Sequence, residues 1–529
     1  MIRIRQIKIP IEKDNLNYLK RKVSLTLKCQ EDDIKKISIS KKSLDARKKP
    51  NIFYIYEVDV DVKNEEHLLK KHQLNKDIFL TPKEKYIYPK IGNKKLKHRP
   101  IIIGSGPSGL FCAYLLAELG YKPIIIERGE MIEERVKSVE KFWETGILNK
   151  NSNVQFGEGG AGTFSDGKLN TLVKDKNFRM KKVFEIFVAS GADKEILYTN
   201  NPHIGTDVLR KVIINLRKKI IAFGGEFHYN TTLTNINIKE NQMTSIEINH
   251  KEIIETDILV LAIGHSARDT FEMLDKKDFS LEPKPFAVGL RIQHPQELIN
   301  INQYGKNTKL LPPASYKLTY QTKEGRGVYS FCMCPGGYVV NASSEEKRLA
   351  INGMSYHDRN SQNANSAIVV TISPKDYGTN PLDGLTFQRE LEEKAYALGN
   401  GKIPIQTIKD FHNSVESKKL GNISPIFKGD YQLTDLNQIF PSYISASIKE
   451  ALSNFDKKIP GFNDDAALLA GVESRTSSPI KIPRDENLES HIKGIYPCGE
   501  GAGYAGGITT SAMDGLKVAE SIISTYQNE

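Results

Sequence analysis

The sequence lacks the features that place a chain in a membrane or outside the cell. No apolar run reaches about 18 residues, so we expect no membrane-spanning helix. The first residues, MIRIRQIKIP, are basic but have neither the continuous apolar stretch nor the small-residue cleavage site of a signal peptide. Five cysteines among 529 residues do not suggest a disulfide framework. We therefore expect a soluble protein of the reducing cytoplasm.

Other absences limit the architecture and the chemistry. No set of cysteines and histidines has the spacing of metal ligands, so no metal is expected. No internal repeat of fixed period is visible. Hydrophobic residues make up 39% and charged residues 26% of the chain, which is an ordinary globular balance. A chain of this length exceeds one core, and we expect two or three domains.

Positive charge is concentrated at one end of the chain. Residues 1–100 carry 26 lysines and arginines against 13 aspartates and glutamates, whereas the remaining 429 residues have a net charge of −2. A basic region of this kind could meet nucleic acid, an acidic protein or an anionic membrane surface. The alternative is a lysine-rich domain whose charge only keeps it soluble. The basic residues are scattered, without an arginine-rich tract, which favours this alternative.

The first hundred residues read as a small independent α/β unit. Alternating apolar residues predict strands at Ile2–Ile9, Ile34–Ser40 and Ile52–Val62. Helical spacing predicts helices at Asp14–Cys29 and Asn64–His72. The order β-α-β-β-α is typical of a ferredoxin-like module, and a basic linker follows it at residues 89–99.

A dinucleotide-binding pattern follows the linker. Ile101–Ile103 is typical of a buried strand and runs directly into the hexapeptide Gly104–Gly109, after which an apolar helix is expected. The first glycine of this pattern makes the turn, Gly106 lets the backbone approach a pyrophosphate, and the last lets the helix pack closely on the strand. The next strand ends at Glu127, where a carboxylate can accept hydrogen bonds from the adenosine ribose.

Two distant segments favour FAD over NAD as the bound dinucleotide. Thr256–His265 is an apolar strand that ends in the pattern Ala-x-Gly, and Gly494–Thr510 combines a strand with a glycine-rich crossing before a helix that reaches Ile523. An FAD site needs such segments because the ribityl chain and isoalloxazine extend beyond the first βαβ unit. No second dinucleotide motif is present, so a dedicated NAD(P)H domain is not expected. A nicotinamide would have to dock transiently.

With these three segments in this order, the chain resembles the glutathione-reductase-like FAD superfamily. The resemblance implies an α/β fold with a Rossmann-type FAD-binding domain and FAD as the cofactor. It also implies that the N-terminus of the helix from Ile508 faces the flavin pyrimidine, where its dipole stabilises negative charge. One departure is Glu500, which stands where the superfamily has an aspartate facing the ribityl chain. Its direct contact with that chain is therefore open.

The block Asn153–Leu169 is similar to the signature of a bacterial family of uncharacterised FAD-dependent dehydrogenases with a small N-terminal α/β domain. Lys284–Arg291, Phe331–Gly337 and Gly471–Pro479 share the resemblance, which covers nearly the whole chain. It does not supply a substrate. The density of glycines in the block suits a backbone packed against a flat ligand, with polar contacts from residues such as Lys168. We expect a wall of the FAD site here, and the alternative is a flexible surface loop.

Candidate catalytic residues follow the apolar strand at 286–292. Arg291 and His294 could face the flavin and bind an anionic substrate, or they could be structural residues before a turn. Arg475 is a third candidate, since Glu473 and Arg475 could form an ion pair near the C-terminal FAD motif, or they could have a purely structural role. Cys332-Met-Cys334 invites a redox-dithiol interpretation, but such a pair closes a small strained ring, and a turn near the ligand is favoured instead.

The sequence thus predicts four segments and an oxidoreductase. The segments are an N-terminal α/β domain (1–95), the first part of the FAD-binding domain (99–284), an inserted α+β substrate or interface domain (285–470), and the C-terminal part of the FAD-binding domain (471–529). The expected activity is hydride transfer between a small substrate and FAD. The alternatives are an RNA-modifying flavoprotein that grips tRNA with its basic domain, and a non-catalytic flavin-binding protein. The expected cofactor-binding residues are Gly104, Ser105, Gly106, Pro107, Ser108, Gly109, Glu127, Arg128, Gly157, Gly159, Gly160, Ala161, Gly162, Thr163, Lys168, Ala262, Gly264, Gly499, Glu500, Gly507, Ile508 and Thr509.

Overall fold

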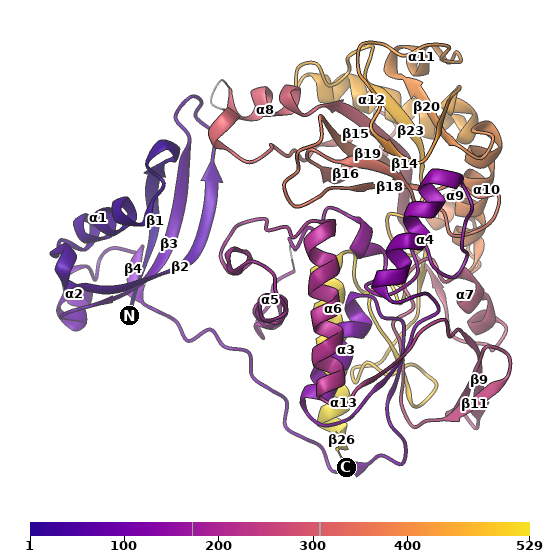
Figure 1. Ribbon diagram of the computed structural model, residues 1–529, viewed down its shortest axis with the longest axis horizontal. Helices are drawn as coiled ribbons and strands as arrows, with labels where there is room; N and C mark the ends of the chain where they lie inside the picture. The colour runs from indigo at the N-terminus through magenta and orange to yellow at the C-terminus, as the bar shows by residue number, and fades with distance from the viewer. Residues whose placement is uncertain (172, 306–307, 529) are drawn as a thin grey trace.

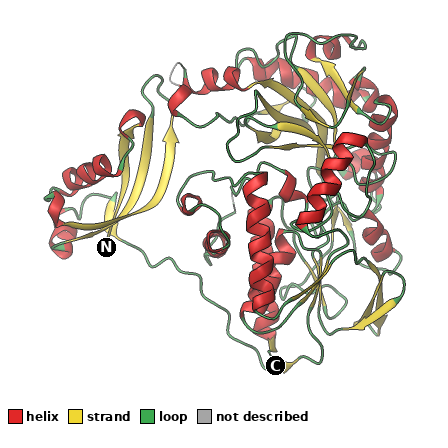
Figure 2. Ribbon diagram, viewed as in Figure 1, coloured by secondary structure: helices red, strands yellow, loops and turns green. Residues whose placement is uncertain are grey.

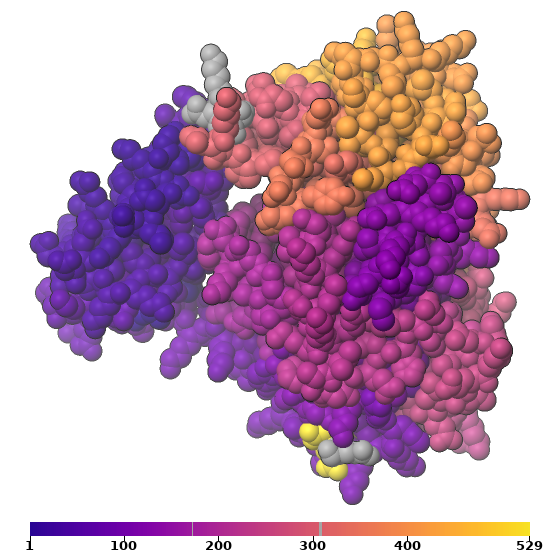
Figure 3. Space-filling model, in the orientation of Figure 1, coloured from indigo at the N-terminus to yellow at the C-terminus, as the bar shows by residue number. Residues whose placement is uncertain are grey.

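A computed structural model describes residues 1–171, 173–305 and 308–528. The N-terminal residues form a lobe beside the main body, to which a long segment connects them (Figures 1 and 3). The main body contains a parallel sheet with helices on it and, above it in this view, a second and larger sheet (Figure 2). No helix in these described ranges combines the length and the apolar character that crossing a membrane requires.

The N-terminal lobe has the predicted ferredoxin-like architecture. Its four strands pair antiparallel in the order β2-β3-β1-β4, and two helices complete the βαββαβ chain order. The last strand, β4, was not predicted from the sequence. The elements are β1 (Ile2–Pro10), α1 (Leu16–Leu27), β2 (Ile34–Asp45), β3 (Phe53–Val62), α2 (Glu65–Lys71) and β4 (Ile78–Leu80).

The first sheet of the main body is the Rossmann sheet, in the order β25-β12-β6-β7-β8, with every pair parallel. Its short strands are apolar and buried except for the edge strand β8, because helices and loops cover both faces. The strands are β6 (Ile101–Ile103), β7 (Ile124–Ile126), β8 (Glu226–His228), β12 (Leu259–Leu261) and β25 (Ile495–Pro497). Strands from near residue 100 and near residue 495 thus belong to one sheet, as the sequence predicts.

Helices cover the Rossmann sheet and bring the two ends of the body together. α3 (Pro107–Glu118) packs against α13 (Ile508–Thr525), and at Gly515 the two backbones come so close that an added Cβ would lie 2.1 Å from the Ser108 carbonyl oxygen. The other helices of this region are α4 (Ile132–Thr145), α5 (Arg179–Ala189), α6 (Thr206–Ala222) and α7 (Arg268–Asp275). A small antiparallel sheet precedes β12, with strands β9 (Leu233–Lys239), β10 (Gln242–Ile248) and β11 (Glu252–Glu255).

The second large sheet of the body has seven strands in the order β15-β16-β19-β14-β23-β20-β22. The strands are β14 (Phe286–Pro295), β15 (Thr319–Gln321), β16 (Gly327–Cys334), β19 (Asn363–Ile372), β20 (Ile403–Thr407), β22 (Tyr431–Leu433) and β23 (Leu468–Glu473). The boundary expected at residue 470 falls within β23. Helices and a three-stranded sheet surround it: α8 (Gln296–Tyr304), α9 (Pro374–Tyr377), α10 (Asp383–Leu398), α11 (Ile408–Asn413), α12 (Ser442–Asp456), β17 (Tyr338–Asn341), β18 (Ile351–Met354) and β21 (Phe427–Lys428).

Short pairings tie distant segments to the body. β5 (Lys94–Lys95), in the expected linker, pairs parallel with β26 (Tyr526–Gln527), and β13 (Glu282–Pro283) pairs with β24 (Ile480–Lys481). The N-terminal lobe contacts the body through β2, where the Lys42 amide donates to the Tyr198 carbonyl.

Candidate functional site

A cavity lies between the two large sheets of the body. Its volume of about 360 Å³ is within the range of ligand pockets, about 300–1,000 Å³. One side is built at the carboxyl ends of β6, β7 and β12, where open α/β sheets bind ligands. The opposite side comes from the seven-stranded sheet and its neighbours, through Phe331, Cys332, Asn352 and Glu473. We call this cavity the main pocket.

The glycine-rich hexapeptide forms one end of the main pocket. Gly104 has a φ of +97°, and a Cβ there would lie 2.4 Å from the Ala262 carbonyl oxygen, so only glycine fits this turn. Gly106 faces Gly160 across the pocket wall, with an added Cβ 3.8 Å from the Gly160 Cα. α3 starts at Pro107 without a side-chain cap, which leaves its N-terminal N–H groups and dipole to an anionic ligand.

Glu127 lines the same end of the pocket and ties three loops together. One carboxylate oxygen accepts from the Ser105 amide at 2.9 Å and hydroxyl at 2.8 Å. The other accepts from the amides of Gly129 and Gly157, at 3.0 and 3.1 Å. A carboxylate has about four acceptor positions, so the protein itself uses the full capacity of Glu127. In this structure Glu127 therefore fixes the glycine loops.

Replacing Glu127 with alanine is expected to leave the amides of Ser105, Gly129 and Gly157 without their acceptor and to loosen both glycine loops. Each unsatisfied buried donor costs about 1–3 kcal/mol, so we expect FAD affinity to fall by at least about tenfold. Flavin release on dilution, followed by fluorescence, measures the change. Glu130→Ala is the matched control, because that neighbouring carboxylate bonds the Ser138 hydroxyl outside the pocket. Equal flavin retention in the two variants would contradict the role given to Glu127.

The glycine-rich block near residue 160 lines the pocket, as the sequence predicts. Gly157 and Gly160 have φ values of +113° and +65°. Under these turns lies Arg135, which is fully buried and donates to five backbone carbonyls, those of Asn153, Val154, Gly157, Glu158 and Gly160. Burial lowers the pKa of Arg135 to about 9. The hydrogen bonds of Arg135 therefore fix the backbone of the block, and the interpretation as a flexible surface loop is not supported. Sequence reasoning missed Arg135.

The C-terminal glycine segment and the Ala-x-Gly strand meet further along the pocket. Glu500 lies with its Oε1 3.3 Å from Nδ1 of His265, and both residues line the pocket. The Nε2 atom of His265 is buried without a partner in the described structure. α13 begins beside them at Ile508, and its N-cap Gly507 makes no side-chain cap. A polar group of a ligand would satisfy His265 Nε2 and the N–H groups of this helix end.

The structure corrects two of the candidate catalytic residues. Arg291 is fully buried behind the pocket wall, where Glu473 holds it at 3.0 Å through two bonds and Asn365 accepts from it at 2.9 Å. His294 is also fully buried; its Nε2 bonds the Phe462 carbonyl at 2.7 Å, and burial lowers its pKa to about 4. Neither residue lines the pocket. Both belong to the interior of the seven-stranded sheet, and the expected Glu473–Arg475 ion pair is replaced by Glu473–Arg291.

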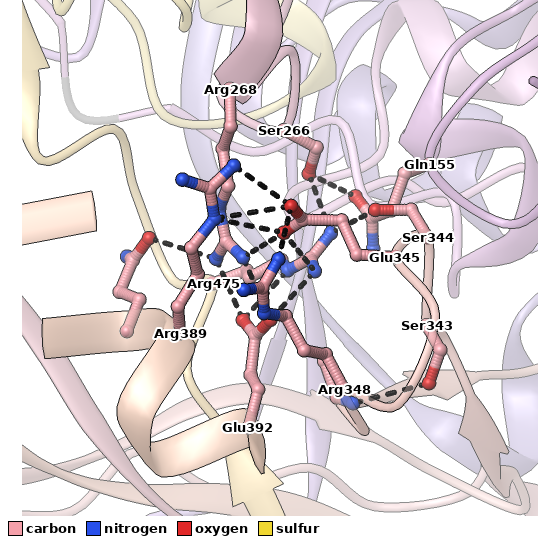
Figure 4. Close-up of polar contacts among 12 residues, drawn as sticks. Gln155, Ser266, Arg268, Ser343, Ser344, Glu345, Arg348, Arg389, Glu392 and Arg475 are labelled. Carbon is pink, nitrogen blue, oxygen red and sulfur yellow. Dashed lines mark hydrogen bonds and ion pairs between the residues drawn. The ribbon is translucent and has the colours of Figure 1, made fainter. Parts of the chain in front are cut away.

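Arg475 does line the pocket, but an ion network holds it. Glu392 on α10 accepts from Arg475 at 2.8 and 2.9 Å and from Arg268 on α7 at 2.7 and 2.8 Å. The remaining amino group of Arg475 donates hydrogen bonds to the hydroxyls of Ser266 and Ser344. Figure 4 shows the arginines converging on Glu392 and Glu345. The network joins the Rossmann part of the body to the seven-stranded part at the edge of the pocket.

Most of the predicted cofactor residues line the main pocket: Gly104, Gly106, Pro107, Ser108, Glu127, Arg128, Gly157, Gly160, Ala161, Gly162, Lys168, Ala262, Gly264, Glu500, Gly507 and Ile508. The others support its walls from behind: Ser105, Gly109, Gly159, Thr163, Gly499 and Thr509. Sequence reasoning did not name Ser266 and Asn352 as lining residues, whereas other lining residues lie in segments that it expected near the ligand: Gln155, His265, Phe331, Cys332 and Glu473. The position of Ser266 directly after the Ala-x-Gly segment could have indicated it.

These features fit FAD. Glycines without Cβ atoms, the uncapped starts of α3 and α13, and an unpartnered imidazole nitrogen follow one another along a single pocket. A pyrophosphate suits the α3 end, and an electron-rich ring suits the α13 end.

Three family profiles match the chain. Residues 285–476 match the FAD-dependent protein, C-terminal domain-like family, residues 102–146 match an NAD(P)-binding Rossmann-like domain, and residues 1–61 match a domain of unknown function. A protein of Clostridium beijerinckii, named only as an uncharacterized protein, is 48% identical over 532 residues, which cover 99% of each chain.

Solved structures show a weaker likeness. L-proline dehydrogenase from P. horikoshii is 13% identical with a TM-score of 0.35, over 82% of this chain and 94% of that one. Glycine oxidase from Bacillus cereus is 14% identical with a TM-score of 0.32, over 82% and 96%. The sequence matches and the pocket agree with each other. The chain therefore belongs to one family with the Clostridium beijerinckii protein, and in it a Rossmann-like domain precedes a domain of the FAD-dependent protein, C-terminal domain-like family.

Proposed function

We propose that the protein is a dehydrogenase or reductase that transfers a hydride between a small organic substrate and FAD. The observation that carries the proposal is the shape of the main pocket, which continues from the nucleotide-binding loops to a polar wall of the seven-stranded sheet. The substrate is proposed to enter on the side of Cys332, Asn352 and Glu473.

Bound FAD supplies two-electron redox chemistry, and the residues of the chain position the reactants. The α3 N-terminus is proposed to bind the pyrophosphate, and Glu127 to hold the loops around it. The α13 N-terminus supplies a positive dipole end, which favours a negatively charged reduced ring. Lys168 lines the pocket with its Nζ 4.0 Å from the Asp166 carboxylate. We propose that its ammonium group binds an anionic group of the substrate.

Nicotinamide remains a proposed electron donor. The Rossmann-like match covers residues 102–146, the same unit that forms the FAD end of the pocket. NADH or NADPH would therefore dock transiently at the substrate side rather than on a domain of its own.

The RNA-modifying alternative lacks a supporting observation. On the helix-free face of the N-terminal sheet, the basic residues stand beside carboxylates: Arg3 pairs with Asp59, Lys36 lies opposite Asp61, and Lys41 lies opposite Glu57. Such a face has little net positive charge for a phosphate backbone. The high lysine content is better explained as a solubility feature of the domain.

The test is an anaerobic screen of the purified holoprotein. We expect one FAD per chain and loss of the yellow absorbance on addition of NADH, NADPH or one of a panel of amino acids and hydroxy acids. Flavin that dithionite reduces, but that no member of the panel reduces, would favour the non-catalytic alternative. Colourless protein that cannot be reconstituted with FAD would contradict the proposal altogether.

A further inference from the structure

Two cysteines lie at an irregular point of the seven-stranded sheet. The pairing of β16 with β19 shifts register between Phe331 and Cys334, which places a bulge at Cys332. Cys332 has a φ of +43°, a left-handed conformation that is uncommon for a residue with a side chain. Bulges of this kind often redirect a side chain next to a functional site. Here the redirected residue is Cys332, which lines the main pocket.

The two thiols differ in environment. Cys332 is partly exposed toward the pocket, whereas Cys334 is fully buried beneath it, and both are free cysteines. The Cys334 thiol donates to the Cys332 carbonyl at 3.3 Å. The Cys332 thiol can thus contact a reactant in the pocket, whereas the Cys334 thiol can react only with Cys332.

Positive charge lies behind Cys332. Arg291, fixed by Glu473, donates to the Cys332 carbonyl at 3.0 Å, and Lys168 lines the pocket nearby. The side-chain contact with Cys334, together with the charges of Arg291 and Lys168, lowers the pKa of Cys332. The same contact and burial raise the pKa of Cys334. Cys332 is therefore the more readily ionised of the two thiols, which suits it to be the attacking cysteine and Cys334 to be the resolving one.

We propose that Cys332 and Cys334 form a redox-active dithiol that exchanges two electrons with the flavin bound in the main pocket. Oxidation forms one bond between the two Sγ atoms and passes two electrons and the Cys334 proton to the oxidised flavin. The reverse reaction takes two electrons and one proton from the reduced flavin, breaks the S–S bond and returns a thiolate and a thiol. The site goes beyond the proposed hydride transfer, since it gives the pocket a second electron store whichever substrate is used.

The small ring of a Cys-x-Cys disulfide is compatible with this role. A ring closed over three residues is strained, and strained disulfides are more easily reduced than structural ones. Easy reduction is a defect in a structural bridge and an advantage in a pair that must cycle. The bulge at Cys332 interrupts the regular alternation of side chains along the strand at the place where the two cysteines lie.

The test is an electron count on air-oxidised holoprotein. Anaerobic titration with dithionite is expected to consume two more electrons per FAD in the wild type than in Cys334→Ser or Cys332→Ser. Peptide mapping of the oxidised wild type, after alkylation of free thiols, is expected to show a 332–334 disulfide that is absent after reduction. Cys29→Ser is the matched control, because Cys29 lies in the N-terminal lobe, and it is expected to keep the wild-type electron count.

Equal electron counts in the wild type and Cys334→Ser, with both thiols alkylated in oxidised wild-type protein, would overturn the inference. Peptide mapping needs no variant, so the result stands even where Cys332→Ser loses FAD. Dithionite replaces the unknown substrate, so a failure of the proposed hydride transfer leaves this count readable. A failure of the dithiol, in turn, leaves the flavin reducible by its substrate.

Discussion

Replacing Glu392 with glutamine is expected to lower the free energy of unfolding by about 3–5 kcal/mol. Glu392 is fully buried, and its two oxygens accept from Arg268, Arg475 and the Ser474 hydroxyl. An amide removes the negative charge and turns an N–H group toward the guanidinium donors. The positive charges of two buried arginines then lose their main partner, and a buried charge without a partner strongly destabilises the folded state. Urea unfolding of the holoprotein measures the change.

Glu393→Gln is the matched control, since the neighbouring carboxylate is 51% exposed and bonds only Arg348 at the surface. Exposed ion pairs contribute about 0–1 kcal/mol, so this variant is expected to unfold close to the wild type. Similar losses in the two variants would contradict the weight given to the buried network. Arg475 also lines the pocket, and we expect Glu392→Gln to release FAD faster as well.

The Glu392 effect has a defined pH dependence. Burial opposes ionisation of Glu392, but the charges of Arg268 and Arg475 outweigh it and hold its pKa well below its usual range. A carboxyl whose pKa is lowered on folding stabilises the folded state above its unfolded pKa, here 4.5, and loses that contribution as the pH falls further. The stability difference between wild type and Glu392→Gln is therefore expected to be full at neutral pH and to shrink below pH 4.5.

Replacing Gly109 with alanine is the second change expected to have a large effect, because the new Cβ would lie 1.9 Å from the Gly104 carbonyl oxygen. The Gly104 oxygen is a backbone atom and the new Cβ is fixed to the backbone of α3, so α3 must move away from the turn that precedes it. Overpacking of this kind costs about 1–3 kcal/mol, and occasionally more. Because the N-terminus of α3 moves with the helix, we expect the purified protein to lose most of its FAD as well as stability.

Gly106→Ala separates the two effects. A Cβ there meets only the Gly160 Cα, at 3.8 Å, and the φ of −71° suits alanine. The apo-protein is expected to unfold like the wild type, while FAD binding weakens because the methyl group enters the pocket. Thermal unfolding of apo-protein and flavin content measure the two separately. Wild-type stability and full flavin content in Gly109→Ala would show that α3 does not press on the turn.

The sequence predicts the nucleotide end of the site well because that chemistry is local. The turn at Gly104, the helix after Gly106 and the strand before Glu127 are specified by neighbouring residues, and the structure has them at the expected places. The ferredoxin-like strand order also follows from local alternation together with the small set of ways in which such units pair.

The substrate side could not be predicted in the same way, since its contacts are long-range. β14 is buried on both faces, so alternation along it cannot say which side chains face a pocket, and Arg291 and His294 turned inward to other partners. Arg291 pairs with a carboxylate 182 residues away, and Arg475 with one 83 residues away. A sequence cannot show such partners without the fold. The sequence predicts a turn near the ligand at Cys332, but it could not show which side chain faces the pocket, because a bulge changes the facing of residues without a recognisable local signal.

The pairing of the first and last segments of the body in one sheet has a consequence for biosynthesis. β12 pairs with β25 and α3 packs on α13, yet 395 residues separate Gly104 from Gly499. At a translation rate of about 5–20 residues per second, the nascent nucleotide-binding loops wait on the order of 20–80 s for their partners. During that time the apolar edge of β12 and one side of α3 are uncovered. The nucleotide-binding loops therefore reach their final packing only after β25 and α13 have been synthesised.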